Sequence, residues 1–312
     1  MSTKTDTITL TLAHSPDADD LVMWWPLVGV RDATGTPVAG DLGRPRVDTG
    51  RYRFELVARD VEALNKTAIE GGAPYDITAI SCAAYPRLAD RYAITRSGAS
   101  FGENYGPRVV VREDSDLGSL DELRDADPLV AIPGVHTSAS LTLHLIHPGV
   151  RTEPMLFSEI PGAVVSGRVD AGVLIHEAQL TFGALGLREL GDLGRWWHDD
   201  TGGLPLPLGL NVVARSLDDR FGGGSMSEVS GLLSRSIAIA LDERDASRRY
   251  LALNNADKPE WEDPALVDRY LDMYVSPMTL DMGPRGRDAI EAFLSRGVDA
   301  GLTPDPGAIE LV

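Results

Sequence analysis

The sequence predicts an α/β protein built as two lobes with a ligand cleft between them. Short β-rich runs alternate with helical patterns almost throughout, which is typical of an α/β fold with largely parallel sheets. The 312 residues, 43% of them hydrophobic, are enough for one large domain or two of ordinary size. Two extended crossings, at about 106–112 and 206–214, divide the pattern. We therefore predict a discontinuous first lobe over 1–107 and 212–312, and a second lobe over 108–211.

The first hundred residues contain four predicted strands. Residues 7–14 alternate apolar and polar side chains with the period of a strand, and the apolar run 21–30 after them predicts a helix capped by Asp19 or Asp20. Asp60 can cap a second helix that runs to about residue 70. The segment 31–50, rich in Gly, Pro and Asp, reads as an exposed insertion. The other three strands are predicted at 52–60, 75–81 and 91–97.

The pattern restarts after the glycines of residues 97–107. Ser119 and Glu122 have the spacing of a capping box for a short helix. Val229, Leu233 and Ile237 belong to an i, i+3, i+4 series that predicts one buried helix face near the C-terminus. Helices are also predicted at 141–147 and near 160–166. Strands are predicted at 108–113, 129–133, 155–157 and 171–177, and residues 204–215 are predicted to be a proline-stiffened connection into another strand.

Composition excludes several classes of function. With 29 basic and 47 acidic residues the formal net charge is −18, which disfavours nucleic acid and anionic membrane surfaces as partners. A single cysteine, Cys82, rules out an internal disulfide or a thiolate zinc cluster and suits a reducing compartment. We find no signal-peptide pattern and no apolar run of the roughly 18–20 residues that span a membrane. A cytoplasmic protein is expected.

The segment PGVHTSAS, residues 133–140, lies between a predicted strand and a predicted helix. The start of a helix offers unpaired backbone N–H groups and a partial positive charge, which suit a carboxylate or a phosphate. Thr137 and Ser138 add hydroxyl groups at this point, and His136 precedes them. The two hydroxyls can equally serve only to cap the helix.

The segment AGVLIHEAQ places His176 and Glu177 at the end of an apolar strand. Ligands collect at the carboxyl ends of parallel strands, and imidazole is the side chain best suited to proton transfer near neutral pH. A histidine that follows four apolar residues can also be a hydrogen-bonded group of the core. Both interpretations of His176 stay open on the residues alone.

The segment HSPDADD, residues 14–20, contains the densest cluster of carboxylates near any predicted turn. A calcium loop is rejected because Val22 stands where that loop needs Gly and Val28 where it needs Glu. Helix capping is the default for Asp19 or Asp20, whereas Asp17 is a candidate to line the cleft and bind hydroxyl groups.

Two other stretches resemble nucleophile motifs. GASFG fits the G-x-S-x-G elbow with Ser100 as nucleophile, but Gly106 and Pro107 oppose the helix that an elbow requires. Cys82, at a predicted strand end, is more simply a small buried residue than a nucleophile, because no base is recognisable beside it.

Several segments occur in the same order as in a known family, and together they resemble it. This is the menaquinone-biosynthesis family that includes 1,4-dihydroxy-6-naphthoate synthase and, more distantly, chorismate dehydratase. The segments are DVEALNKTAIEG, ISCAAYPRLADRYAITRSGASFGENYGP, PGVHTSA, AGVLIHEAQLTF, DLGRWWHDDTGGLPLPLG and YVSPMTLDMG. The resemblance implies a type II periplasmic-binding-protein-like fold. It also implies a lyase that fragments cyclic dehypoxanthine futalosine, without a metal or redox cofactor.

The resemblance also implies roles for individual residues. His176, in the I-H-E segment, corresponds to the catalytic base, and Ser81, Thr137 and Ser138 correspond to ligand-contacting groups. Ser15 and Ile175 lie in or beside matching segments and are predicted to contact the substrate, as is Asp17 from its place at the cleft. The partner is then a carboxylated small molecule, and a homodimer is left open.

The chain departs from the family pattern at the first turn. Where the family shows S-P-C-P-N-D, this sequence has SPDADD, so that Asp17, Ala18 and Asp19 replace C-P-N. Cys82 stands in place of a tyrosine, and the segment 31–50 is longer than usual. An added carboxylate at the cleft would change which substrate groups fit. A paralogous binding protein without catalysis and a chorismate dehydratase are therefore the alternatives.

Overall fold

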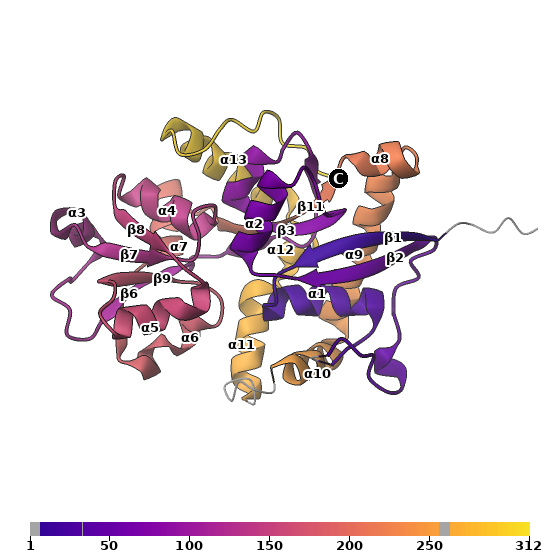
Figure 1. The fold of residues 1–312 in the computed structure, drawn as a ribbon, viewed down its shortest axis with the longest axis horizontal. Coiled ribbons are helices and arrows are strands. Elements are labelled where there is room, and N and C mark those ends of the chain that lie inside the picture. Colours follow the sequence, from indigo (N-terminus) through magenta and orange to yellow (C-terminus); the bar gives the residue numbers. More distant parts are fainter. Residues whose placement is uncertain (1–6, 33, 256–262) are drawn as a thin grey trace, which may run out of the picture.

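The protein folds into two lobes, each organised around its own β-sheet (Figure 1). The computed structural model describes residues 7–32, 34–255 and 263–312. The strands are β1 (Ile8–His14), β2 (Tyr52–Ala58), β3 (Ile77–Ser81), β4 (Tyr92–Ile94), β5 (Ser100–Gly102), β6 (Arg108–Arg112), β7 (Leu129–Ile132), β8 (Arg151–Pro154), β9 (Ala171–Leu174), β10 (Leu187–Asp192) and β11 (Leu206–Ala214).

The helices cover both sheets. They are α1 (Ala18–Val28), α2 (Val61–Glu70), α3 (Leu123–Ala126), α4 (Ser138–Ile146), α5 (Ile160–Val165), α6 (Ala178–Thr181), α7 (Leu193–Thr201), α8 (Ser216–Phe221), α9 (Ser225–Asp242), α10 (Arg244–Asn254), α11 (Pro264–Tyr274), α12 (Pro277–Leu280) and α13 (Gly283–Asp299). None of the helices in the described part of the chain is long and apolar enough to cross a membrane.

The first lobe contains the sheet β2-β1-β3-β11-β4, with β5 paired to β11. Helices cover both of its faces: α1 and α9 pack against each other, and α2 packs on β1 and β3. Alternate residues of β1 serve the two faces, because successive side chains of a strand point in opposite directions. Leu10 and Leu12 join the largest apolar cluster, whereas Ala13 packs with Leu64 of α2.

The second lobe contains the sheet β10-β6-β9-β7-β8. Val109 and Val111 of β6 pack into the cluster that contains Leu143 of α4, and Val110 between them packs against Ile160 at the start of α5. Both faces of this strand are therefore buried, which explains its continuous run of valines.

The sheets are mixed, so the expectation of largely parallel sheets is wrong in part. β1, β2 and β3 are parallel, as are β7, β8 and β9, but β6 and β11 run antiparallel to their neighbours. These two strands follow the crossings between the lobes, and a chain that enters a sheet from the other lobe can run against its strands. The predicted division of the chain stays a prediction, and its limit between 211 and 212 lies inside β11.

Most predicted elements are present, and three details differ. Asp60 caps α2 through the amides of Glu62 and Ala63, as expected. Ser119 forms no capping bond; its hydroxyl donates instead to the carboxylate of Glu122 at 3.4 Å. Residues 155–157 are not a strand, because the edge strand of the second sheet is the polar segment β8 just before them. The cap position of α1 is Asp17 and not Asp19 or Asp20, since that helix begins at Ala18.

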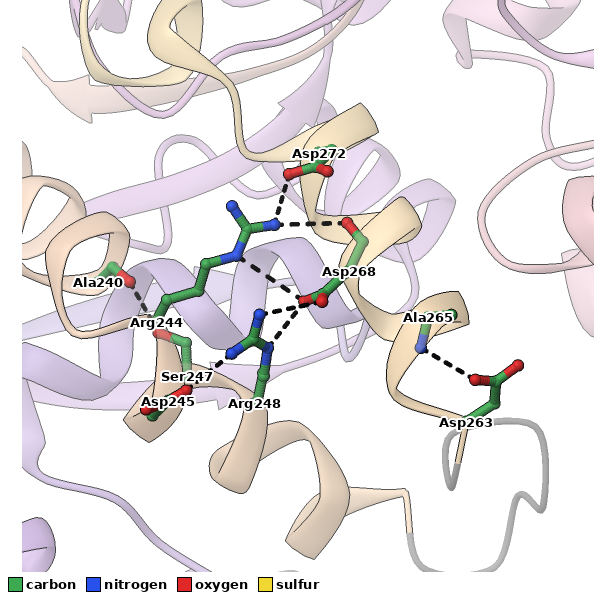
Figure 2. A network of polar contacts seen from close by, with 9 residues as sticks. All are labelled: Ala240, Arg244, Asp245, Ser247, Arg248, Asp263, Ala265, Asp268 and Asp272. Atoms are coloured by element: carbon green, nitrogen blue, oxygen red, sulfur yellow. Dashed lines mark hydrogen bonds and ion pairs between the residues drawn. The ribbon is translucent and has the colours of Figure 1, made fainter.

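A polar network joins α10 to α11 (Figure 2). Arg248 binds both carboxylate oxygens of Asp268, at 2.7 and 3.0 Å, and Arg244 pairs with Asp272. Leu251 of α10 and Leu271 of α11 also pack with α1 in one apolar cluster. The network therefore fixes how these two helices sit against the first lobe.

Candidate active site

A cavity lies at the ends of strands from both sheets. β1 and β3 are parallel neighbours in the first lobe, and β7 and β9 are parallel neighbours in the second. The segments after these four strands face one another, the arrangement in which α/β proteins bind ligands. All seven residues that the sequence predicts for the site line this cavity: Ser15, Asp17, Ser81, Thr137, Ser138, Ile175 and His176.

His176 follows β9 in a left-handed backbone conformation, with a φ of 55°. Such a conformation is uncommon for a residue with a side chain and tends to occur at functional sites. The Nε2 atom lies 3.0 Å from Oδ2 of Asp17, across the cleft. The ring also meets the edge of Phe157, with a centroid distance of 5.0 Å. His176 therefore lies against the cavity rather than deep in the core of the second lobe.

Two aspartates of the turn after β1 form hydrogen bonds within that turn. Asp20 accepts a hydrogen bond from the backbone amide of Ser15 at 2.6 Å, and Asp17 accepts one from the Ser15 hydroxyl. Asp17 occupies the position before α1 but makes no capping bond, and only 3% of its side chain is exposed. Asp20 is thus structural, whereas Asp17 is turned toward the cavity.

The start of α4 combines a cap with a contact between the lobes. Thr137 caps the helix by accepting a bond from the amide of Ser140 at 3.2 Å. Ser138 does not cap; its hydroxyl donates to the carbonyl of Leu208 at 2.7 Å and accepts from the amide of Ala83 at 3.3 Å. The amides of Ser138 and Ala139 belong to the first turn, where an α-helix supplies no internal partner.

Glu62 is a cleft-side residue that the sequence analysis missed. Its carboxylate, on α2 of the first lobe, accepts from the amides of Val135 at 3.1 Å and His136 at 3.2 Å in the second lobe. Gly134, with a φ of 152°, makes this approach possible, because an added Cβ there would come within 2.4 Å of the Glu62 side chain. A glutamate in the first turn of a helix usually serves only the helix dipole, so the pattern gave no sign of this partner.

Ser81 is oriented by another residue that was not predicted. Asn65 of α2, fully buried, accepts from the Ser81 amide at 2.9 Å and donates to its hydroxyl at 3.0 Å. Asn211 and Gln179 also line the cavity. These amide side chains carry no local motif, and only the fold brings them to the site.

The two nucleophile hypotheses fail on geometry. Ser100 lies in β5 and its hydroxyl accepts from the amide of Gly209 at 3.0 Å, with no helix directly after it. Cys82 is fully buried, and burial raises the pKa of its thiol, so that it stays protonated. Among the residues that the structure describes, no group of three or more His, Cys, Asp or Glu side chains is placed to hold a metal ion.

Two α/β lobes around one cleft define a protein of the type II periplasmic-binding-protein-like class. The alkanesulfonate-binding protein SsuA from Xanthomonas axonopodis pv. citri has this fold and superposes with a TM-score of 0.62 at 14% identity, covering 97% of each chain. At that identity the likeness concerns the fold alone. A crystal structure from Archaeoglobus fulgidus is more similar, with a TM-score of 0.76, 32% identity and 94% of this chain and 98% of that chain covered.

The chain belongs to the menaquinone-biosynthesis family, whose pattern matches residues 10–299. It is 34% identical over 298 residues to a 1,4-dihydroxy-6-naphthoate synthase from Thermus thermophilus, covering 95% of this chain and 97% of the relative. A second enzyme of that name, from Streptomyces coelicolor, is 32% identical, with 96% of each chain covered. The resemblance stated from the sequence is confirmed at the level of the family.

Proposed function

We propose that this protein is a lyase that converts cyclic dehypoxanthine futalosine to 1,4-dihydroxy-6-naphthoate in menaquinone biosynthesis. Two relatives with the name of that enzyme align over nearly the whole chain. The observation that carries the proposal is the meeting of His176 with the start of α4 across one cavity, in a member of this family.

In the proposed reaction His176 is the base. An imidazole at the cavity wall can accept a substrate proton near neutral pH, and general-base catalysis contributes roughly 10²–10⁴-fold to the rate. The reaction consists of proton transfer and carbon–carbon cleavage, so it calls for no cofactor.

The walls of the cavity suit the three parts of the proposed substrate. The first-turn amides of Ser138 and Ala139 would receive its carboxylate, since a helix start favours negative charge. The hydroxyls of Ser15 and Ser81 would meet its sugar-derived hydroxyls. Apolar side chains would cover its aromatic face, and those lining the cavity are Met23, Val61, Ile80, Ile175 and Leu208.

Incubation with cyclic dehypoxanthine futalosine tests the proposal. The purified protein should release 1,4-dihydroxy-6-naphthoate, measured by chromatography and mass spectrometry, and His176→Ala should lower the rate about 10²–10⁴-fold by removing the base. His198→Ala, a half-buried histidine outside the cavity, is the matched control. The proposal is wrong if the wild-type protein forms no product under conditions in which the Thermus thermophilus relative is active.

Two alternatives give different results in the same experiments. A binding protein that has lost catalysis would show ligand-induced thermal stabilisation that persists in His176→Ala, with no product formed. A chorismate dehydratase would consume chorismate and release 3-enolpyruvylbenzoate. The relatives named as synthases favour the first proposal over both.

We also propose that the protein works in the cytoplasm on a small carboxylated substrate, and that the chain passes between the lobes at the two predicted crossings, with β11 belonging to the first lobe. A homodimer is compatible with this function, and size-exclusion chromatography with light scattering would detect it.

A further inference from the structure

Asp17 and His176 come from different lobes and meet inside the cleft. Asp17 follows β1 in the first lobe, and His176 follows β9 in the second. Their side chains approach to 3.0 Å between Oδ2 and Nε2, which is the distance of an ion pair. Both side chains are largely buried, with 3% of Asp17 and 16% of His176 exposed, so water screens this contact little.

We propose that Asp17, from the first lobe, is a positioning residue for His176 and holds its imidazole in one tautomer. This inference rests on the proposed function insofar as His176 is taken as the base. It assigns Asp17 a role other than the substrate contact predicted from the sequence.

The tautomer follows from the chemistry of the carboxylate. An ionised carboxylate only accepts hydrogen bonds, and Oδ2 of Asp17 already accepts one from the Ser15 hydroxyl. The Nε2 atom facing that oxygen must therefore carry the ring proton. In a neutral imidazole the other nitrogen, Nδ1, is then the basic one. When a substrate proton moves to Nδ1, the resulting imidazolium lies beside an ionised carboxylate that stabilises its charge.

The turn around Asp17 is built to hold this carboxylate in place. Asp20 fixes the backbone of Ser15, and Ser15 in turn donates its hydroxyl to Asp17. A carboxylate oriented in this way loses little conformational entropy when it binds the imidazole. On the other side of the cleft, the left-handed backbone of His176 and the edge of Phe157 restrict the ring.

The same contact bears on substrate choice. The family that the sequence resembles is expected to have a cysteine in place of Asp17, and an added carboxylate facing the ligand would repel a carboxylated substrate. Because Oδ2 of Asp17 is directed to Ser15 and His176, its negative charge is offset within the protein. The departure at residue 17 is therefore compatible with the family substrate.

Nitrogen-15 NMR of the histidine rings tests the tautomer without any substrate. The chain has six histidines, and the signals of His176 are those that disappear in His176→Gln. Above the titration range of imidazole, wild type should show the proton on Nε2. In Asp17→Asn and Asp17→Cys the two tautomers should mix. Asp192→Asn, which removes another buried carboxylate outside the cavity, should leave the His176 signals unchanged.

Kinetics with cyclic dehypoxanthine futalosine form the second arm. Asp17→Asn should lower kcat by about 10²–10⁴-fold, the range expected when a general base is misplaced, with little change in KM. The inference is overturned if wild type carries the proton on Nδ1, or if both Asp17 variants keep the wild-type tautomer and kcat. If wild type is inert but shows the Nε2 proton and the Asp17-dependent mixing, the pairing stands and the proposed function fails.

Discussion

His14 ends the first strand as a buried imidazole, immediately before the turn that carries Asp17. Only 3% of its surface is exposed, and its Nδ1 atom lies 2.6 Å from the carbonyl of Ser15. Burial lowers the pKa of His14 below its ordinary value of 6.5, more than the Ser15 carbonyl and the charge of Asp17 raise it. The ring is therefore neutral in the folded protein at neutral pH.

This neutral ring makes the folded state sensitive to acid. Below pH 6.5 the unfolded chain binds a proton at His14 that the folded chain does not, so the free energy of unfolding falls as the pH falls toward the lowered pKa. In His14→Asn, an amide can still donate to Ser15 but cannot titrate, so the pH dependence should be shallower. Urea denaturation at about pH 7.5 and about pH 5.5 measures the difference.

Part of the acid sensitivity should remain in that variant. The pKa of His136 is also lowered, first by burial, so it contributes to the same pH range. Equal pH dependence in wild type and His14→Asn would contradict the assignment of a buried neutral ring to His14.

At the level of elements, the joint between α2 and α4 connects the two lobes beside the cleft. Glu62 of α2 accepts from the two amides that precede Thr137, and 8% of its side chain is exposed. It holds the α4 start, which the proposed substrate carboxylate would approach, against the first lobe. The joint therefore couples ligand binding to the relative placement of the lobes.

Removal of the Glu62 carboxylate should loosen this joint. Glu62→Ala leaves the amides of Val135 and His136 without their acceptor, at a cost of about 1–3 kcal/mol to the contact between the lobes. Hydrogen exchange at these two amides should accelerate, and KM should rise more than kcat falls. Glu70→Ala, an exposed glutamate on the same helix, is the matched control. Unchanged exchange in Glu62→Ala would show that the contact does not hold the loop.

How far the sequence predicts an element depends on whether its partners are local. Asp60 caps α2 and Thr137 caps α4 through amides two or three residues away, so composition and spacing suffice. Glu62 and Asn65 act on residues far along the chain, and no local pattern contains that information. The antiparallel direction of β11 likewise depends on how the chain re-enters the first lobe.

The site shows the same division. His176, Ser81 and Thr137 could be predicted because each lies at or soon after the end of a recognisable strand, in a segment that resembles the family. The partner of His176 could not, because Asp17 lies 159 positions earlier and on the other lobe. The local sequence pattern predicted that Asp17 lies near the cleft, but it did not predict the contact with His176.

At the level of the whole molecule, the two lobes meet over a cavity that belongs to neither alone. Contacts that cross it include Asp17 with His176, Glu62 with the α4 loop, and Ser138 with Leu208. A ligand that enters the cavity must displace some of these contacts and form others with both lobes. The account therefore predicts one ligand position, between the start of α4 and residue 176.

A crystal structure of His176→Ala soaked with cyclic dehypoxanthine futalosine tests this position most directly, because a variant without the base should retain the substrate. The predicted result is a substrate bound in the cavity, with its carboxylate on the amides of Ser138 and Ala139 and its reacting portion facing the space left by the imidazole. A substrate bound at any other place on the protein, or a carboxylate turned away from α4, would contradict the account.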